Sequence, residues 1–123
     1  MADPRHRLGL DSEDATAAWL TSVGWRVVAR RKRSAEGGEV DIVAIDPRGV
    51  LVAVEVKARR TARAGSGIES IDARRVMRLR RTLAAFARAS TKPRLGLRID
   101  LVAAEAVPGR PGHWQLRRFP GIG

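Results

Sequence analysis

Two acids and a lysine stand at a spacing that could build a site for metal-dependent hydrolysis. Asp41 is followed, after thirteen intervening residues, by Glu55, Val56 and Lys57. Carboxylates are ligands that Mg²⁺ and Mn²⁺ prefer, and they leave coordination positions open for phosphate oxygens. A lysine beside them could orient a water or neutralise charge that develops on a phosphate. The pattern therefore predicts phosphodiester chemistry, provided that the three side chains meet.

The residues between the two acids indicate a β-hairpin. Apolar runs at residues 39–46 and 50–57 are joined by a short turn. Pro47 suits the first central position of a type I turn, and Gly49 suits the left-handed residue of the loop. We therefore expect a three-residue hairpin loop with a glycine bulge.

This loop determines which side chains face each other. It pairs Asp46 with Val50, and counting back along both strands places Asp41 opposite Glu55. A register shifted by one residue would place the two acids on opposite faces. On the acidic face we expect Ile45, Val43 and Glu39 against Leu51, Ala53 and Lys57, and on the other face Val40, Ile42 and Ala44 against Val56, Val54 and Val52.

The opposed acids need something that offsets their charge. Directly opposed side chains have Cβ atoms roughly 4.5 to 5.5 Å apart, a distance at which like charges destabilise the pair. A divalent cation, a raised pKa on one acid, or a neighbouring Lys57 or arginine could each compensate. An alternative without a metal is a salt bridge between Glu39 and Lys57, with Asp41 paired to an arginine. We favour Asp41 and Glu55 as ligands of Mg²⁺ or Mn²⁺.

The rest of the chain indicates a single α/β domain over residues 1–123. Apolar residues recur at helical spacing in two segments and in short strand-like runs elsewhere. The order of these elements predicts a mixed five-stranded sheet flanked by helices. The expected helices cover residues 10–23 and 70–89, and the expected strands outside the hairpin cover residues 25–31, 97–104 and 113–119.

Glu13 is a further candidate from the first expected helix. It lies at the edge of the core face, which we expect to consist of Ala17, Trp19, Leu20 and Val23. An acid at the edge of an apolar face is unusual, which favours a role in the site. The alternative is that Glu13 belongs to the first turn after an N-cap at Asp11, where the helix dipole favours acids.

The net charge indicates a polyanionic partner. The chain has 24 lysines and arginines against 13 acids, a formal charge of +11, which favours nucleic acid or an anionic surface. We expect contacts with nucleic acid, and with DNA in particular, although a charged helix face can also be merely solvated. The second helix has a core stripe of Val76, Leu79, Leu83 and Phe86, opposite Arg74, Arg78, Arg81 and Arg88. The residues expected at nucleic acid are Arg59, Arg60 and Arg63 in a basic loop, and Arg74, Arg75 and Arg78 on this helix.

The composition excludes several other classes of protein. The chain has no cysteine, which excludes disulfide frameworks, thiolate zinc sites and cysteine nucleophiles. No apolar run is long enough to cross a membrane, and residues 1–9 lack the apolar core of a signal peptide. We therefore expect a cytoplasmic protein without a membrane partner.

The hairpin sequence resembles that of a known family. The segments Gly-Glu-Val-Asp-Ile-Val-Ala at 38–44 and Leu-Val-Ala-Val-Glu-Val-Lys at 51–57 are similar to the YraN-like family of uncharacterised bacterial proteins. This family is a branch of the restriction-endonuclease-like superfamily, which includes archaeal Holliday junction resolvases. The resemblance extends from the Glu13 helix to residues 98–103. It implies a restriction-endonuclease-like fold and Mg²⁺-dependent phosphodiester hydrolysis.

The resemblance also implies roles for individual residues. Asp41, Glu55 and the carbonyl of Val56 would bind the metal, Lys57 would be the catalytic lysine, and Glu13 would match an acid that resolvases add from a helix. The family tends to have Asn at the position of Arg31 and Lys at the position of Arg75.

Together these features predict a metal-dependent endonuclease that acts on structured or branched DNA. Resolution of a junction needs two cuts, so a homodimer is expected if junctions are the substrate. Two alternatives stay open. The first is a nucleic-acid-binding protein with a nuclease fold that does not turn over or that depends on a partner. The second is a structural protein with a buried cluster of ion pairs.

Overall fold

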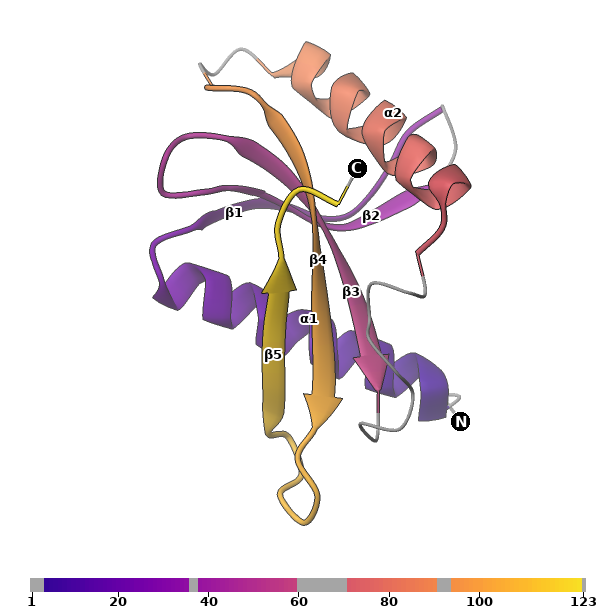
Figure 1. The fold of residues 1–123 in the computed structure, drawn as a ribbon, viewed down its shortest axis with the longest axis vertical. Coiled ribbons are helices and arrows are strands. Elements are labelled where there is room, and N and C mark those ends of the chain that lie inside the picture. The colour runs from indigo at the N-terminus through magenta and orange to yellow at the C-terminus, as the bar shows by residue number, and fades with distance from the viewer. Residues whose placement is uncertain (1–3, 36–37, 60–70, 91–93, 123) are drawn as a thin grey trace.

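Five strands form one mixed sheet with a helix on each face. The computed structural model describes residues 4–35, 38–59, 71–90 and 94–122, with the backbone alone for residues 4–10 and 59. The strands follow the order of the chain across the sheet, and β3 and β4 are parallel while the other neighbours are antiparallel. The elements are α1 (Pro4–Ser22), β1 (Arg26–Arg33), β2 (Glu39–Ile45), β3 (Leu51–Arg59), α2 (Ala73–Ala89), β4 (Leu97–Ala106) and β5 (Trp114–Phe119) (Figure 1). The arrangement is the predicted three-layer restriction-endonuclease-like fold.

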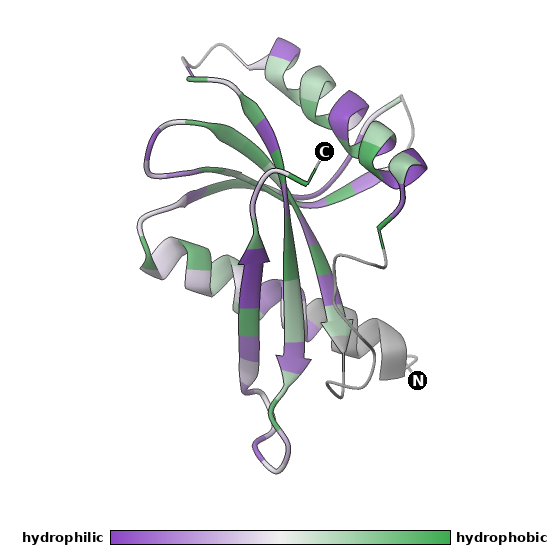
Figure 2. Ribbon diagram, viewed as in Figure 1, coloured by the Kyte–Doolittle hydropathy of each residue, from purple (hydrophilic) through white to green (hydrophobic). Residues whose placement is uncertain are grey.

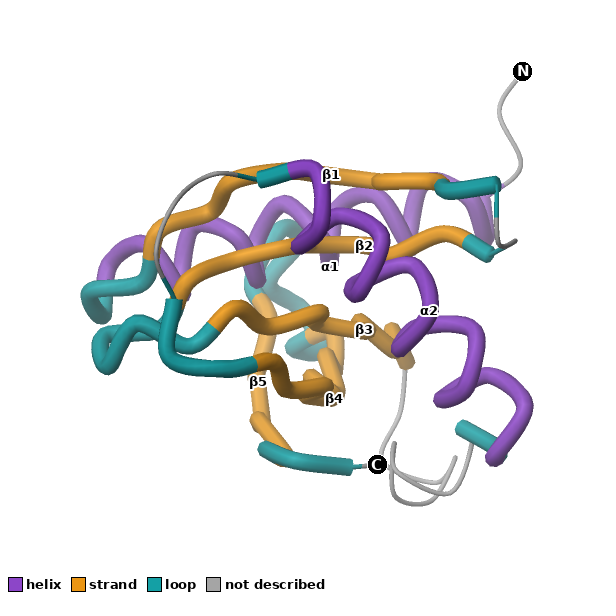
Figure 3. Tube along the Cα trace, turned by 90° about the horizontal axis from the view of Figure 1, so that it is seen from above, coloured by secondary structure: helices purple, strands orange, loops and turns teal. Residues whose placement is uncertain are grey.

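The two helices cover opposite faces of the sheet, as Figure 3 shows from above. Leu79 and Leu83 of α2 pack on one face with Val43 and Ala53. Leu20 of α1 belongs to the cluster on the other face, which includes Ile42, Val52 and Val54. The central strands are accordingly the most hydrophobic part of the molecule (Figure 2). Within the described residues, neither helix is long and apolar enough to cross a membrane.

Helix α2 agrees closely with its prediction. It ends at Ala89 as expected, and it begins at Ala73 because the side chain of Asp72 caps it by accepting a hydrogen bond from the Arg75 N–H at 2.8 Å. Leu79 and Leu83 are buried, and Val76 and Phe86 pack against the same cluster. The predicted core stripe is therefore confirmed.

Helix α1 is longer than predicted, and its buried positions differ. It begins at Pro4, a residue type suited to the first helical turn, so Asp11 lies inside the helix and is not its N-cap. Val23 follows the helix and is 50% exposed, so its assignment to the core is wrong. Ser12 and Thr16 are buried instead, and the Thr16 hydroxyl donates to the Ser12 carbonyl at 2.8 Å. Hydroxyl residues at core positions weaken the apolar periodicity from which the helix was predicted.

The hairpin turn has the predicted form. The N–H of Gly49 donates to the carbonyl of Asp46, and the N–H of Asp46 donates to the carbonyl of Val50, both at 2.9 Å. Gly49 has a φ of 95°, the left-handed conformation that glycine adopts without strain. The strands pair from Ile45 with Leu51 to Ile42 with Val54 in the expected register. Asp41 and Glu55 are the next residues of the two strands beyond the pair of Ile42 with Val54.

Candidate functional site

The ladder of the hairpin changes at Asp41. In an unbroken ladder the N–H of Val56 would donate to the Val40 carbonyl, because the pair at the turn sets an alternation that reaches these residues. Instead the Val56 N–H donates to Oδ2 of Asp41 at 2.8 Å. Val40 packs with Val43 and the α2 residues, so the expectation that it shares a face with Ile42 is wrong. The Asp41 carboxylate thus takes the place of a backbone acceptor at the edge of the core.

Asp41 and Glu55 are brought together as the register predicts. Each side chain is among the groups that shift the pKa of the other. Burial, and after it the hydrogen bond and charge of Glu55, raises the pKa of Asp41 to about 8. Near neutral pH the pair is therefore an Asp41 carboxylic acid beside a Glu55 carboxylate.

Arg75 of α2 keeps Glu55 ionised. Its Nε donates to Oε2 of Glu55 at 2.6 Å, and one terminal nitrogen donates to Oε1 at 3.0 Å and to the carbonyl of Glu39 at 2.8 Å. Burial favours the neutral acid, but these hydrogen bonds, with the Arg75 charge, lower the pKa of Glu55. Arg75 is therefore placed against the acids rather than on the exposed arginine face of its helix. In the sequence, the signal for this placement was the position of Arg75 next to Val76, at the side of the core stripe.

Lys57 lies two residues beyond Glu55 on the same strand and is half-buried. Its charge is one of the factors that lower the pKa of Glu55. The Glu39 carboxylate accepts a hydrogen bond from Arg33 of the edge strand β1 at 3.0 Å. Glu39 is therefore paired with Arg33 and not with Lys57, the partner considered in the alternative without a metal. Lys57 thus lies close enough to the acids for its charge to act on Glu55.

Glu13 approaches the same site from α1. Its side chain is 13% exposed, and its Oε1 lies 3.6 Å from Nε of Arg31, which has a left-handed φ of 50°. Within the described part of the chain, this buried oxygen makes no hydrogen bond. Burial raises the pKa of Glu13, and its charge adds to the raised pKa of Asp41. The helix-dipole explanation fails because the helix begins at Pro4, well before this residue.

The arginines that were expected at nucleic acid are only partly among the described residues. Arg74, Arg78, Arg81 and Arg88 are exposed on α2, as predicted. Arg60 and Arg63 lie outside the described residues, as does the side chain of Arg59 at the end of β3.

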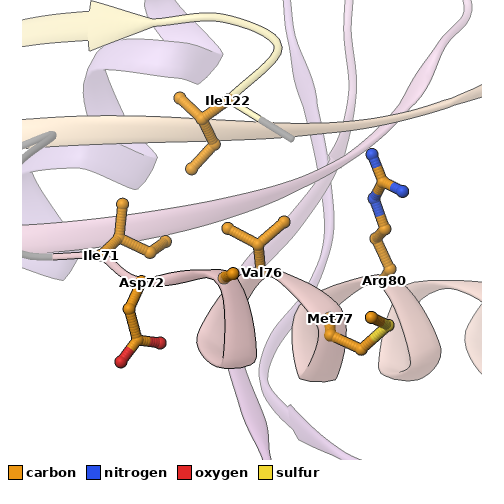
Figure 4. Close-up of a pocket in the computed structure, with 7 residues that line it drawn as sticks. Ile71, Asp72, Val76, Met77, Arg80 and Ile122 are labelled. Atoms are coloured by element: carbon orange, nitrogen blue, oxygen red, sulfur yellow. The ribbon is translucent and has the colours of Figure 1, made fainter.

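One pocket of about 360 Å³ lies at the beginning of α2 and is lined by Ile71, Val76, Met77 and Ile122 among others. Figure 4 shows Ile71, Val76 and Ile122 directed toward one another across it. Its lining contains none of the predicted catalytic residues, so we do not assign it to the reaction.

The atoms that could bind a metal ion at the acid pair are all oxygens. Within the described ranges, no three residues among His, Cys, Asp and Glu form a group that could hold a metal ion. The protein would therefore supply Asp41, Glu55 and the Val56 carbonyl, and water or phosphate would complete the shell. Such a set suits Mg²⁺ or Mn²⁺, and a cation here would offset the repulsion between the acids that helps to raise the pKa of Asp41.

Comparison with known sequences identifies the family. Residues 12–104 match the family described as "Uncharacterised protein family UPF0102". This chain belongs to the UPF0102 family. The matched region contains Glu13, the complete hairpin and the part of α2 that carries Arg75, and the resemblance to the YraN-like family is thereby confirmed.

Individual UPF0102 proteins match most of the chain. The UPF0102 protein of Symbiobacterium thermophilum is 40% identical over 112 residues, which are 90% of this chain and 91% of that protein. The UPF0102 protein of Herpetosiphon aurantiacus is 36% identical over 126 residues, covering 99% and 98% of the two chains. That of Deinococcus radiodurans is 41% identical over 73 residues, covering 59% and 58%.

Proposed function

We propose that this UPF0102 protein is a metal-dependent endonuclease that hydrolyses phosphodiester bonds in structured or branched DNA. The observation that carries the proposal is the convergence of Asp41 and Glu55, the first held by the Val56 N–H and the second by Arg75, with Lys57 on the same strand as Glu55. Two acids held next to each other, with Glu55 buried and Asp41 half-buried, are costly for stability. Such a cost is commonly found at functional sites.

Asp41, Glu55 and the Val56 carbonyl would hold Mg²⁺ or Mn²⁺, which when bound polarises a phosphate oxygen and lowers the pKa of a coordinated water. Lys57 would place its ammonium against the phosphate and stabilise the charge that grows there during attack. Glu13 would accept a hydrogen bond from the attacking water through Oε1, which lies 3.6 Å from Arg31 but accepts no hydrogen bond among the described residues. In this way the chain's own groups orient the water and the phosphate.

The exposed arginines would hold the DNA. Arg74, Arg78 and Arg81 lie on the solvent side of the helix that places Arg75 at the acids. Arginine on such a surface binds phosphates regardless of sequence, which suits recognition of DNA shape. Arg59, Arg60 and Arg63 would extend this contact, and a homodimer would supply two cuts on a branched substrate.

A panel of DNA structures tests the function. Duplex, flapped, single-stranded and four-way-junction DNA would be incubated with the protein and Mn²⁺, Mg²⁺ or EDTA. We expect metal-dependent cuts in a branched or flapped substrate, and loss of cleavage in Lys57→Met but not in Lys32→Met, which removes an exposed strand lysine outside the site. Cleavage that is equal in the two variants would argue against the assigned role of Lys57.

A second candidate function is DNA binding without cleavage. It is favoured by one observation, that Arg75 already contacts both carboxylate oxygens of Glu55. This candidate predicts DNA binding that weakens with salt and no cleavage of the panel by wild-type protein with either metal.

A further inference from the structure

Arg75 gives the acidic site a positive charge of its own. Its guanidinium binds Glu55 through two nitrogens, at 2.6 and 3.0 Å, and is also tied to the Glu39 carbonyl. The side chains of Glu55 and Arg75 are 4% and 25% exposed. The guanidinium is therefore held in place as part of the site.

The acids of the site bring no net negative charge to a cation. Even with both Asp41 and Glu55 ionised, as metal ligands must be, their two negative charges are balanced by the positive charges of Arg75 and Lys57. A divalent cation would bring an excess of positive charge into a largely buried place. Such an excess is costly because little water is present to screen it. A phosphodiester is an anion, so its arrival beside the cation would offset part of that excess.

We propose that Arg75 couples the two ligands, so that the site binds a divalent cation weakly alone and more tightly together with a phosphodiester. The inference rests on the proposed metal site. Arg75 weakens the binding of a cation without phosphate in two ways. It repels the cation, and it occupies the Glu55 oxygens that the cation must share. By linkage, the factor by which the phosphodiester tightens cation binding is also the factor by which the cation tightens phosphodiester binding. Metal would accumulate at the acids chiefly when DNA is present.

Binding measurements on charge variants of Arg75 test this coupling. The affinity of Mn²⁺ for the protein alone would be measured by electron paramagnetic resonance, without and with dimethyl phosphate as the probe for a phosphodiester. Arg75→Gln keeps a donor for Glu55 but removes the charge, whereas Arg75→Lys keeps the charge. We expect Arg75→Gln to bind Mn²⁺ alone at least about tenfold more tightly than wild type, and Arg75→Lys to stay within about threefold. Dimethyl phosphate should tighten Mn²⁺ binding by wild type more than by Arg75→Gln.

The outcomes separate this inference from the proposed function. Equal Mn²⁺ affinity of wild type and Arg75→Gln, with no difference in the effect of dimethyl phosphate, would overturn the coupling and leave the metal site standing. Absence of Mn²⁺ binding in all three proteins would overturn the metal site and the coupling together. Arg75→Met provides a second uncharged variant if Arg75→Gln does not fold, as judged by circular dichroism.

Discussion

Oδ2 of Asp41 lies 2.8 Å from the backbone nitrogen of Val56 and accepts its hydrogen bond. An acid is thereby built into the hairpin ladder, where it replaces a backbone carbonyl. Because its partner is main chain, the Asp41 carboxylate is fixed by the fold. The same contact brings it against Glu55, the residue before Val56.

The Asp41 proton makes the stability of the metal-free protein depend on pH. Its native pKa of about 8 lies above that of an unfolded aspartate, about 3.9. The contribution of this group to the free energy of unfolding is therefore full below about pH 4 and is lost as the pH rises toward 8.

Asp41→Asn should remove this dependence, because its amide stays uncharged and can still donate to Glu55. In urea unfolding with EDTA, the stability of Asp41→Asn relative to wild type should increase by roughly 1 to 4 kcal/mol between about pH 5 and pH 8.5. A difference that is constant with pH would show that Asp41 does not carry a raised pKa.

Cation binding should release the proton that the raised pKa keeps on Asp41. Near pH 7 we expect about one proton per Mn²⁺ bound, because a carboxylate ligand must be deprotonated. Calorimetric titrations in buffers of different ionisation enthalpy measure this number. Asp41→Asn offers the control, and any residual Mn²⁺ binding by it should release close to no protons. Equal release by both proteins would mean that another group loses the proton.

A second buried acid, Asp100, should be structural. It is fully buried and accepts hydrogen bonds from Arg98 at 2.7 and 2.9 Å, from Arg118 at 3.0 Å and from the Gly121 N–H at 3.0 Å. Asp100→Ala would take a shared acceptor from Arg98 and Arg118, whose side chains are 27% and 33% exposed, and should cost roughly 2 to 4 kcal/mol of unfolding free energy.

The pair of Asp14 with Arg30 provides the matched control. Its distance is also 2.7 Å, but its side chains are 67% and 35% exposed. Asp14→Ala should therefore change the unfolding free energy by less than about 1 kcal/mol. Similar losses for Asp14→Ala and Asp100→Ala in chemical denaturation would refute the assignment of Asp100 to the structural core.

Neighbouring arginines on α2 should differ in their effect on DNA binding. Arg74 is exposed, whereas Arg75 is bound to Glu55. In fluorescence anisotropy with EDTA, Arg74→Gln should weaken DNA binding and reduce the slope of log affinity against log salt by about 1. Arg75→Gln should leave this slope nearly unchanged. A larger loss of affinity in Arg75→Gln than in Arg74→Gln would contradict this prediction and place the DNA on the other side of the helix.

The hairpin and its acids could be predicted because their signals are local. Pro47 and Gly49 determine the loop, and the period of two carries its register to Ile42 and Val54, the residues next to Asp41 and Glu55. The prediction failed at Val40, because a carboxylate that replaces a backbone acceptor interrupts the alternation.

The rest of the site depends on packing between distant segments. Arg75 is one of several arginines in its helix, and only its contact with Glu55 distinguishes it from Arg74. The start of α1 was missed because Ser12 and Thr16 occupy buried positions where apolar residues were expected. Glu13 was a candidate from its place on the helix, but only the folded structure shows that one of its buried oxygens lacks a hydrogen bond among the described residues.

The most direct test of the central claim is a comparison of DNA cleavage by wild type and Asp41→Asn. Both proteins would be given the best substrate of the DNA panel with Mn²⁺, at concentrations that saturate DNA binding. We predict metal-dependent cleavage by wild type and a loss of at least about a hundredfold in the rate for Asp41→Asn, with similar DNA affinity. Equal rates for the two proteins, or no cleavage by wild type with Mg²⁺ or Mn²⁺, would contradict the proposed nuclease.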